Sequence, residues 1–515
     1  MSVNAFWEWA KLDPDRIALI TAEGETQTFG ELGARVNQLS HALQALGCQR
    51  GDGVAILLNN HAEWAEVFLA THQIGMYLTA INYHLTGPEV AYILSNCEAK
   101  VFITESAYSD AANKAVNELG FDRHHCFSID PLAGFQDYET LLAEHSAAPP
   151  QERSAGNLML YTSGTTGRPK GVRRPLSEGP PETSAAMSAL LGMLFDIQPG
   201  AGSHLVAGPL YHAAPSGFAM GALHLGQSVV LTKKWSAEDC LKKIQDHQVT
   251  ATHMVPTMFH RLLELPESVR EQYDLSSLKN VIHAAAPCPA DTKRKMIDWF
   301  GPVIYEYYAA TEGGGAYVNA HEWLKNPGTV GRAWPGAELI ILDDDGNALP
   351  PNEVGTIYMT SPMGEFKYFK DDKKTAESAR GKMFTVGDMG YLTEDGWLFI
   401  CDRKSDMIIS GGVNIYPAEI EAVLHQHPQI GDVAVLGVPD EAWGESVKAV
   451  VEVAPGVIPS DELAEDILAF AAENLAKYKL PRSIDFIDQL PRLPTGKLYK
   501  RLLRDQYWEG TEKKV

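Results

Sequence analysis

The feature that most constrains the fold is a regular alternation of short apolar runs with amphipathic helical patterns. Strand-like runs at 53–58 and 100–105 flank a helical pattern at 62–76. The alternation then continues downstream, at 228–232, 236–247, 251–255, 280–285 and 302–308. Because parallel strands are usually connected by a crossover helix, this order predicts an α/β fold whose parallel sheets are covered by helices.

One helix can be predicted with its boundaries. Between residues 28 and 47, leucines and a valine recur every three or four positions, which is the spacing of one helix face. Thr28 and Glu31 have the spacing of a capping box at the start of this helix. Gly47 supplies a residue that commonly follows a helix end. We therefore expect an amphipathic helix across 28–47.

The pattern changes near residue 330. Two strand patterns surround a turn rich in Gly and Pro within 337–361, and a second hairpin is expected at 389–401 around Asp395 and Gly396. These hairpins predict a small antiparallel unit. An α+β pattern then follows, with helices expected at 417–426 and 461–475 and strands at 432–438 and 446–453. We expect an N-terminal domain at 1–404, with its β-rich unit near 330–400, and a C-terminal domain at 405–515.

Charge and cysteine content limit the possible partners and compartments. The net charge of −23 argues against nucleic-acid binding through a broad basic surface, although a local group of cations can still bind an anion. The six cysteines are scattered without a CxxC pair, which favours a reducing compartment. We see neither a signal peptide nor an apolar run near the roughly 18 residues of a membrane span. These features predict a cytoplasmic protein without integral membrane segments.

The stretch "LMLYTSGTTGRPKGVRR", at 158–174, combines hydroxyls, glycines and cations directly after a short apolar run. Backbone N–H groups, hydroxyls and cations are good phosphate donors, so we expect a phosphate-binding loop. The Walker pattern fails, because Pro169 precedes Lys170 and Gly171 follows it. A plain polar surface loop rarely has this density of such groups. The loop residues are Thr162, Ser163, Gly164, Thr165, Thr166, Gly167, Arg168, Lys170 and Gly171.

"YTSGTTGRPKG" resembles the phosphate-binding signature of the adenylate-forming enzymes, a superfamily that includes acyl-CoA synthetases, luciferases and peptide-synthetase adenylation domains. Further motifs follow in the family's order: "PLYHAAP" (209–215), "HAAAPCP" (283–289), "YYAATE" (307–312), "VGDMGYLTEDGWLFICDRKSDMI" (386–408) and "LPRLPTGKLYKR" (490–501). The resemblance implies a large N-terminal domain of helix-covered, mostly parallel sheets with a small β-barrel-like unit. It also implies a small, mobile α+β C-terminal domain.

The resemblance assigns roles around the acyl group and the adenine. His212 occupies an aromatic position that lines the acyl site in the family. The backbone at Ala285, Ala286 and Pro287 matches a segment that borders the adenine. Relatives often carry two glycines where Ala284 and Ala285 stand here.

The same resemblance assigns the rest of the nucleotide site. Tyr308 would stack on the adenine, Thr311 would lie near the phosphates, and Glu312 would be the carboxylate on the Mg²⁺ side. Asp388 would bind the ribose hydroxyls, since two carboxylate oxygens suit two adjacent hydroxyl groups. Arg403 would lie near it.

Lys497 matches the family's C-terminal catalytic lysine. It would bridge the acid's carboxylate and the ATP α-phosphate, with Thr165 and the rest of the loop steadying the β- and γ-phosphates. For the second step the family rotates its C-terminal domain, and the pivot would be Ser405. Gly411 and Gly412 would then leave room for the pantetheine arm of CoA.

These motifs indicate an ATP-dependent, AMP-forming acyl-CoA synthetase that uses ATP, Mg²⁺ and CoA. Small residues at 213–214, 284–286 and 313–315 suggest a hydrophobic, bulky acid, such as an aryl, branched, longer-chain or steroid side-chain acid. The alternative is that these residues only permit tight backbone packing. An acyl-AMP ligase that loads a carrier protein, a luciferase-like oxidative enzyme and a non-catalytic binding protein are the other candidates. A homodimer is compatible with all of them.

Overall fold

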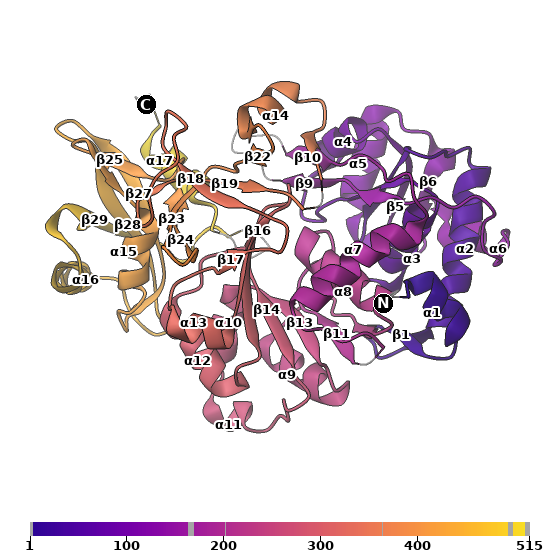
Figure 1. The fold of residues 1–515 in the computed structure, drawn as a ribbon, viewed down its shortest axis with the longest axis horizontal. Coiled ribbons are helices and arrows are strands. Elements are labelled where there is room, and N and C mark those ends of the chain that lie inside the picture. Colours follow the sequence, from indigo (N-terminus) through magenta and orange to yellow (C-terminus); the bar gives the residue numbers. More distant parts are fainter. Residues whose placement is uncertain (1–3, 163–168, 201, 363, 493–497, 510–515) are drawn as a thin grey trace.

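The computed structural model describes residues 4–162, 169–200, 202–362, 364–492 and 498–509 (Figure 1). It confirms the predicted α/β class. One sheet has six parallel strands in the order β7-β6-β5-β3-β4-β8. Its strands are β3 (Gly53–Leu57), β4 (Tyr77–Ala80), β5 (Ala99–Thr104), β6 (Cys126–Ser128), β7 (Gln136–Asp137) and β8 (Asn157–Leu158).

A second sheet has nine strands in the order β17-β16-β15-β14-β13-β11-β12-β1-β2. The six from β15 to β1 run parallel to their neighbours, while β2, β16 and β17 pair antiparallel at the two edges. Its strands are β1 (Ile17–Ile20), β2 (Thr26–Thr28), β11 (Ser203–Val206), β12 (Ser228–Val230), β13 (Ala251–Met254), β14 (Asn280–His283), β15 (Ile304–Ala309), β16 (Gly315–Asn319) and β17 (Arg332–Ala333).

Helices accompany the strands of these two sheets along the chain, as the alternating pattern predicted. They are α1 (Phe6–Leu12), α2 (Phe29–Ala45), α3 (Ala62–Gln73), α4 (Gly87–Asn96), α5 (Ser109–Leu119), α6 (Tyr138–Ala143), α7 (Pro181–Leu194), α8 (Ala213–His224), α9 (Ala237–Asp246), α10 (Pro256–Leu263), α11 (Glu267–Arg270), α12 (Ala290–Phe300) and α13 (Ala320–Lys325). Short 3₁₀ turns lie at Ser106–Tyr108, Arg123–His125 and Lys477–Lys479. Among the helices described, none is long and apolar enough to span a membrane.

The predicted boundaries of the helix at 28–47 are confirmed by α2. The Thr28 hydroxyl accepts a hydrogen bond from the Glu31 N–H at 3.2 Å, and the Glu31 carboxylate accepts one from the Thr28 N–H at 2.8 Å. Gly47 has a φ of 82°, a conformation that favours glycine. The buried face of α2, with Leu32 and Val36 fully buried, belongs to the core beneath the first sheet.

The antiparallel unit expected near 330–400 is also present. Its six strands are β18 (Leu339–Leu342), β19 (Gly355–Thr360), β21 (Ala379–Arg380), β22 (Met383–Phe384), β23 (Asp388–Leu392) and β24 (Leu398–Arg403), and α14 (Asp372–Ser378) precedes β21. A three-stranded sheet of β9 (Leu160–Thr162), β10 (Lys170–Arg173) and β20 (Lys367–Tyr368) was not predicted from the sequence.

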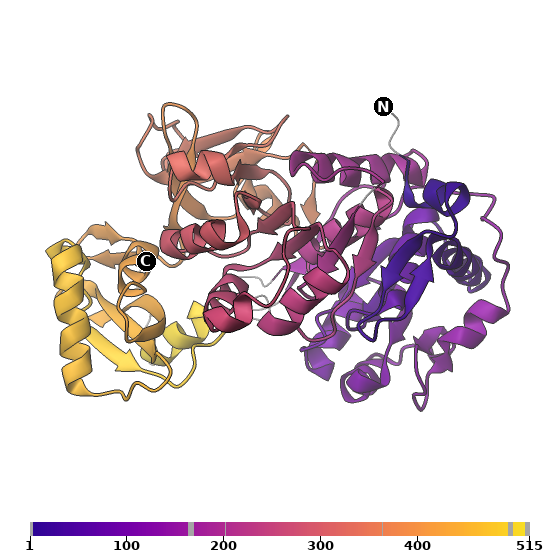
Figure 2. The same cartoon turned by 90° about the horizontal axis from the view of Figure 1, so that it is seen from below.

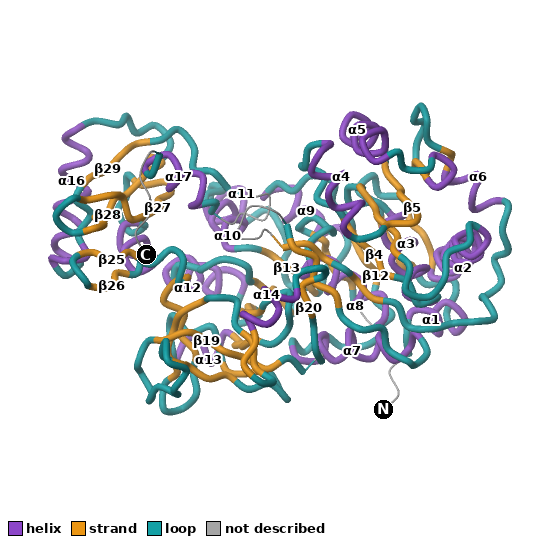
Figure 3. The backbone as a smooth tube through the Cα atoms, turned by 90° about the horizontal axis from the view of Figure 1, so that it is seen from above, coloured by secondary structure: helices purple, strands orange, loops and turns teal. Residues whose placement is uncertain are grey.

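The last sheet contains five strands with the order β26-β25-β28-β27, and β29 pairs parallel with β28. Its elements are β25 (Ile408–Ser410), β26 (Val413–Ile415), α15 (Pro417–Leu424), β27 (Ile430–Asp440), β28 (Gly444–Val453), α16 (Asp461–Asn474), β29 (Ser483–Phe486) and α17 (Lys500–Tyr507). Figures 2 and 3 show this sheet at one end of the molecule and α2, α3 and α5 at the other. The nine-stranded sheet lies between them.

Candidate functional site

The ends of the predicted phosphate loop are held together by strand pairing. Thr162 ends β9, Lys170 begins β10, and the two residues lie opposite each other in antiparallel register. The intervening loop residues predicted to bind phosphate lie outside the described residues, namely Ser163, Gly164, Thr165, Thr166, Gly167 and Arg168. Their phosphate contacts stay predictions.

Lys170 and Glu312 are brought together through Tyr368. The Lys170 ammonium lies 3.1 Å from an Asp371 carboxylate oxygen and 5.7 Å from the centre of the Tyr368 ring. The Tyr368 hydroxyl donates to the Glu312 carboxylate at 2.6 Å. Burial raises the pKa of Tyr368, and the adjacent Glu312 charge raises it further, so Tyr368 remains a donor. Sequence reasoning missed Tyr368, because no spacing rule relates it to a partner 56 residues away.

Arg174 completes this group. Its guanidinium donates to the carbonyl oxygen of Thr311 at 2.7 Å, and the negative charge of Glu312 acts against the burial that lowers the pKa of Arg174. Its Nε atom is buried and has no hydrogen-bond partner among the described residues. Lys170, Arg174 and Glu312 therefore place two cations and one carboxylate near the backbone of Thr311. The sequence motifs did not assign Arg174 to this site.

Glu312 suits the predicted role on the Mg²⁺ side. It is only 5% exposed, and Mg²⁺ usually binds to one or two protein carboxylates together with substrate phosphates and water. Within the described part of the chain, no group of three or more His, Cys, Asp or Glu side chains is arranged to hold a metal ion. A single carboxylate near two cations would suit an ion that arrives with its nucleotide.

Tyr308, Asp388 and Arg403 form a second group. The Tyr308 hydroxyl donates to one carboxylate oxygen of Asp388 at 2.7 Å, and Arg403 Nε lies 3.3 Å from the other. Asp388 and Arg403 lie opposite each other on β23 and β24. Burial, together with the Asp388 charge, holds the pKa of Tyr308 well above its usual range. The structure thus brings together the three residues predicted to bind the nucleoside.

The segment after β14 has an unusual backbone. Ala284, directly after this strand, is buried. Ala285, which follows it, is exposed and has a φ of 76°, and Ala286 and Pro287 continue the loop. Non-glycine residues rarely adopt this conformation, and such residues are concentrated at functional sites. A glycine at position 285 would adopt this φ without strain.

The glycines at 313–315 are explained by close packing. A Cβ atom on Gly314 would lie 2.5 Å from the carbonyl oxygen of Thr360, and one on Gly315 would overlap the carbonyl oxygen of Tyr308. Their φ values of 107°, 74° and 150° also favour glycine. At these positions the structure supports the backbone-packing explanation of the small residues.

His212 lies directly before α8, as its N-cap residue. Burial is the main cause that lowers its pKa to about 4, and His84 contributes. In the described structure its Nε2 atom is buried without a hydrogen-bond partner. A neutral imidazole with an unused nitrogen is compatible with its predicted place at the acyl group.

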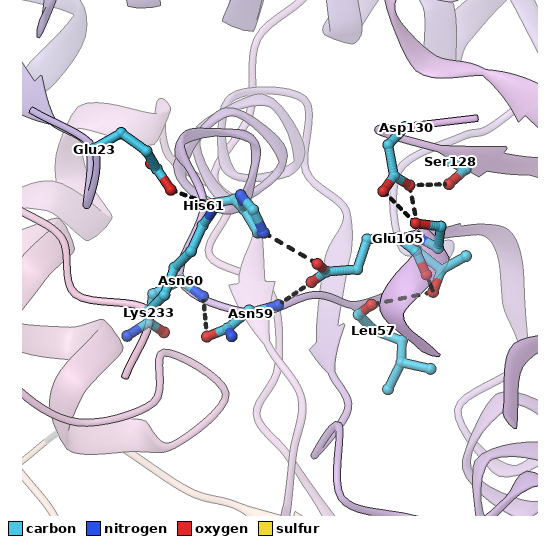
Figure 4. Close-up of polar contacts among 11 residues, drawn as sticks. Glu23, Leu57, Asn59, Asn60, His61, Glu105, Ser128, Asp130 and Lys233 are labelled. Atoms are coloured by element: carbon cyan, nitrogen blue, oxygen red, sulfur yellow. Dashed lines mark hydrogen bonds and ion pairs between the residues drawn. The ribbon is translucent and has the colours of Figure 1, made fainter. Parts of the chain in front are cut away.

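Asn60 positions the segment that leads to His212, and Figure 4 shows the polar contacts of its neighbours Asn59 and His61 with Glu105. The Asn60 side-chain amide donates to the carbonyl oxygens of Gly208 and Thr232, at 3.1 and 2.8 Å, and accepts from the Leu210 N–H at 2.8 Å. Glu105 in turn accepts from the Asn59 N–H at 2.6 Å. Asn60 therefore ties the two parallel sheets together where their strands end.

Gly411 and Gly412 form the two-residue turn between β25 and β26, with φ values of 58° and 81°. A Cβ atom on Gly411 would lie 2.8 Å from a ring carbon of Trp443, whereas one on Gly412 would have no described atom within 4 Å. Turn geometry and the Trp443 ring account for Gly411. The pantetheine path along these glycines stays a prediction.

Contacts from two helices hold the connection between β24 and β25. Arg504 donates to the carbonyl oxygen of Ser405 at 2.9 Å and lies 3.8 Å from the Asp406 carboxylate. The Asp402 carboxylate accepts from the Ala418 N–H, in the first turn of α15, at 2.9 Å. Lys497 lies outside the described residues, so its distance from the two groups above is not described.

Comparisons with known proteins agree with the geometry. The family model "AMP-binding enzyme" matches residues 6–368, and "AMP-binding enzyme C-terminal domain" matches 419–497. The chain is 33% identical to an indoleacetate–CoA ligase of Aromatoleum aromaticum, covering 96% of each chain. It is 30% identical to the fatty acid–[acyl-carrier-protein] ligase ScoC of Streptomyces coeruleorubidus, covering 96% of this chain and 94% of that one.

A solved structure shares the whole architecture. The o-succinylbenzoate CoA synthetase of Bacillus subtilis, determined in complex with its acyl-adenylate intermediate, aligns with a TM-score of 0.82 at 28% identity. The alignment covers 99% of each chain. The described sheets are therefore arranged as in that structure.

Proposed function

This chain belongs to the family of AMP-binding enzymes, and from that membership we propose that it is an AMP-forming acyl-CoA synthetase for a hydrophobic, bulky carboxylic acid. One observation carries the proposal. Tyr308 bonds to Asp388 in one group. Glu312, four residues further along the chain, accepts from Tyr368 in the other group. One short segment thus connects a nucleoside-type site to a phosphate-type site.

In the first step, the acid's carboxylate attacks the α-phosphorus of ATP and pyrophosphate leaves. Both reactants are anionic, so catalysis depends mainly on positioning and on neutralising charge. Lys170 and Arg174 would face the departing phosphates, and Asp388 would hold the ribose. Glu312 would help to hold Mg²⁺, whose positive charge would neutralise negative charge on the phosphate oxygens.

In the second step, the CoA thiol attacks the acyl carbon, the thioester forms and AMP leaves. We propose that the chain divides into domains at 1–404 and 405–515, and that the second turns about Ser405 between the steps. Lys497 would act only before the turn. The substitution Lys497→Ala should therefore slow adenylation by roughly 10²–10³-fold, the scale of one lost preorganised donor, and spare thioester formation from supplied acyl-adenylate. Equal losses in both half-reactions would contradict a two-conformation cycle.

The CoA ligases among the relatives support CoA as acceptor and do not favour carrier-protein loading or a luciferase-like reaction. A cytoplasmic location and a homodimer remain part of the proposal. All six cysteines are free thiols, as expected for a reducing compartment.

A panel of carboxylic acids tests the function. AMP and pyrophosphate release should depend on an added hydrophobic acid, and thioester should form with CoA. Formation of ADP would refute adenylation, and a clear preference for acetate would refute the bulky-acid assignment. Thioester formed only with a holo carrier protein would identify the alternative acceptor.

A further inference from the structure

One face of the nine-stranded sheet, beneath α8, carries an unusual layer of aromatic and histidine side chains. Helix α8 packs on β11, β12 and β13, as its position in Figure 1 shows. Strand register places His204 on β11, His253 on β13 and Tyr307 on β15 on the same face. Phe218 faces them from α8. We call these four residues the His–aromatic layer.

The rings of this layer are ordered around Phe218. Its ring stacks on His253, with centres 5.3 Å apart and planes at 19°, and on His204, at 6.3 Å and 14°. The Tyr307 hydroxyl lies 3.3 Å from His253 Nε2. The Trp334 ring lies beside Tyr307, with centres 6.4 Å apart. The layer thus combines flat apolar surfaces with several nitrogen and oxygen atoms.

Some of these polar atoms lack a protein partner. His204 is 1% exposed, yet neither of its ring nitrogens makes a hydrogen bond to any described residue. Trp334 is 8% exposed, and its Nε1 atom also lacks a partner within the described chain. Leaving a buried polar group unsatisfied costs about 1–3 kcal/mol, so such groups are rare without a bound molecule. At His204 and Trp334 these donors and acceptors are left for a bound molecule to use.

The layer is adjacent to the candidate nucleotide site. Tyr307 immediately precedes Tyr308, and because residues alternate along a strand, the two side chains lie on opposite faces of β15. His253 lies near the carboxyl end of β13, the edge at which open α/β sheets bind ligands. On α8, a Cβ atom on Gly217, the residue before Phe218, would meet no described atom within 4 Å. The layer and the candidate nucleotide site therefore meet only at the carboxyl ends of these strands, which is where one acid would have to reach both.

The histidines of this layer are neutral. Burial is the main cause that lowers the pKa of His204 to about 4 and that of His253 to about 3. The other groups that influence His253 are His204 and His212, which are histidines as well. A neutral imidazole offers one donor and one acceptor but no fixed charge. The layer suits an uncharged polar group better than a second carboxylate.

We propose that the acid is an aromatic acid with an uncharged hydrogen-bonding group, such as a hydroxyl, remote from its reacting carboxylate. The ring would pack against Phe218 and Tyr307, and the polar group would bond to His253 or His204. The inference rests on the proposed function and narrows its substrate class. It separates this chain from ligases of plain hydrocarbon acids and of dicarboxylic acids.

Matched pairs of acids test the inference. Phenylacetate is compared with 4-hydroxyphenylacetate, and cinnamate with 4-hydroxycinnamate, by CoA-dependent AMP release. Phenylacetate is also compared with 1,4-phenylenediacetate, which adds a second charge. We expect kcat/KM for each hydroxylated acid to exceed that of its parent by at least about tenfold, because a site built to bond a hydroxyl discriminates strongly against its absence. The dicarboxylate should be poorer than both.

Three variants locate the effect. His253→Phe and His204→Phe should each reduce the hydroxyl-to-parent ratio of kcat/KM towards one, while activity with the parent acid persists. His283→Phe is the matched control. His283 is also buried without hydrogen-bond partners among described residues, but it lies on the opposite face of the sheet, beside Lys293 and Glu306. Its substitution should leave the ratio unchanged.

The outcomes separate the inference from the function it rests on. Three outcomes would overturn the inference and leave the synthetase assignment intact. They are equal kcat/KM values within each pair of acids, a preference for the dicarboxylate, and hydroxyl-to-parent ratios that neither His253→Phe nor His204→Phe changes. Absence of acid-dependent AMP release with every acid would refute the proposed function and the inference with it.

Discussion

His224 connects α1 to the rest of the molecule, and acid should weaken that connection. Its Nδ1 atom accepts from the Phe6 N–H at 3.2 Å, its carbonyl oxygen accepts from Trp9 Nε1 at 3.2 Å, and its ring lies 5.5 Å from that of Trp7. An imidazole that accepts at Nδ1 must be neutral. Burial is the main cause that lowers the pKa of His224 to about 3, and His72 contributes.

The magnitude follows from proton linkage. In the open or unfolded chain the pKa of His224 returns to about 6.5, so at pH 5 that state binds nearly one proton more than the folded state. Stability therefore falls as the pH drops below about 6.5 and continues to fall until about pH 3. Between pH 7 and pH 5 the loss at this one residue amounts to about 2 kcal/mol, or roughly 25-fold in the opening equilibrium.

Hydrogen exchange of the α1 amides, corrected for intrinsic rates, measures this opening. Protection in the natural chain should fall about 25-fold from pH 7 to pH 5. The variant His224→Asn retains an acceptor without a titrating group, so its protection should change far less. His321→Asn, at an exposed histidine on α13, should behave like the natural chain. An equal fall in the natural chain and in His224→Asn would refute the assignment of the acid effect to His224.

Three further predictions concern single contacts. Glu306→Gln leaves the fully buried Lys293 ammonium, which lies 2.6 Å from Glu306, without its charge partner. Urea denaturation should show that the free energy of unfolding falls by about 3–5 kcal/mol, because the remaining charge is buried and unpaired. Adding Lys293→Met should largely restore it. Gly315→Ala should push the Tyr308 carbonyl aside and raise the KM for ATP, and an unchanged KM would contradict the packing described. Tyr368→Phe removes the donor to buried Glu312, so urea denaturation should show a loss of about 1–3 kcal/mol, and ATP–pyrophosphate exchange by the folded variant should slow at least about fivefold.

The sequence predicts local structure well where the controlling groups are neighbours in the chain. The capping box of Thr28 and Glu31 needs only residues three positions apart, and α2 begins where it indicates. The hairpin at β23 and β24 likewise forms around Asp395 and Gly396. Motif resemblance also assigns Tyr308, Asp388 and Arg403 to one site, and the three side chains are in contact.

The contacts that complete the site could not be predicted in this way. Tyr368 reaches Glu312 across 56 residues, and Asn60 reaches Gly208 across 148, so their pairing depends on how separate sheets pack. The same holds for β29, which pairs parallel with β28 after an intervening helix. The sequence also left two explanations for the glycines at 313–315, which backbone overlap decides at Gly314 and Gly315. Periodicity and spacing carry no information on these distant neighbours.

The contacts around Ser405 affect the speed of any large rearrangement. A turn about this residue would first have to release the Arg504 guanidinium from the Ser405 carbonyl oxygen and the Ala418 N–H from Asp402. Each of these charge-assisted bonds contributes about 1.5–3 kcal/mol, so breaking both before the turn would slow the departure from this arrangement by roughly 10²–10⁴-fold. If the proposed turn occurs, the connector would act as a latch whose release sets the dwell time of this arrangement.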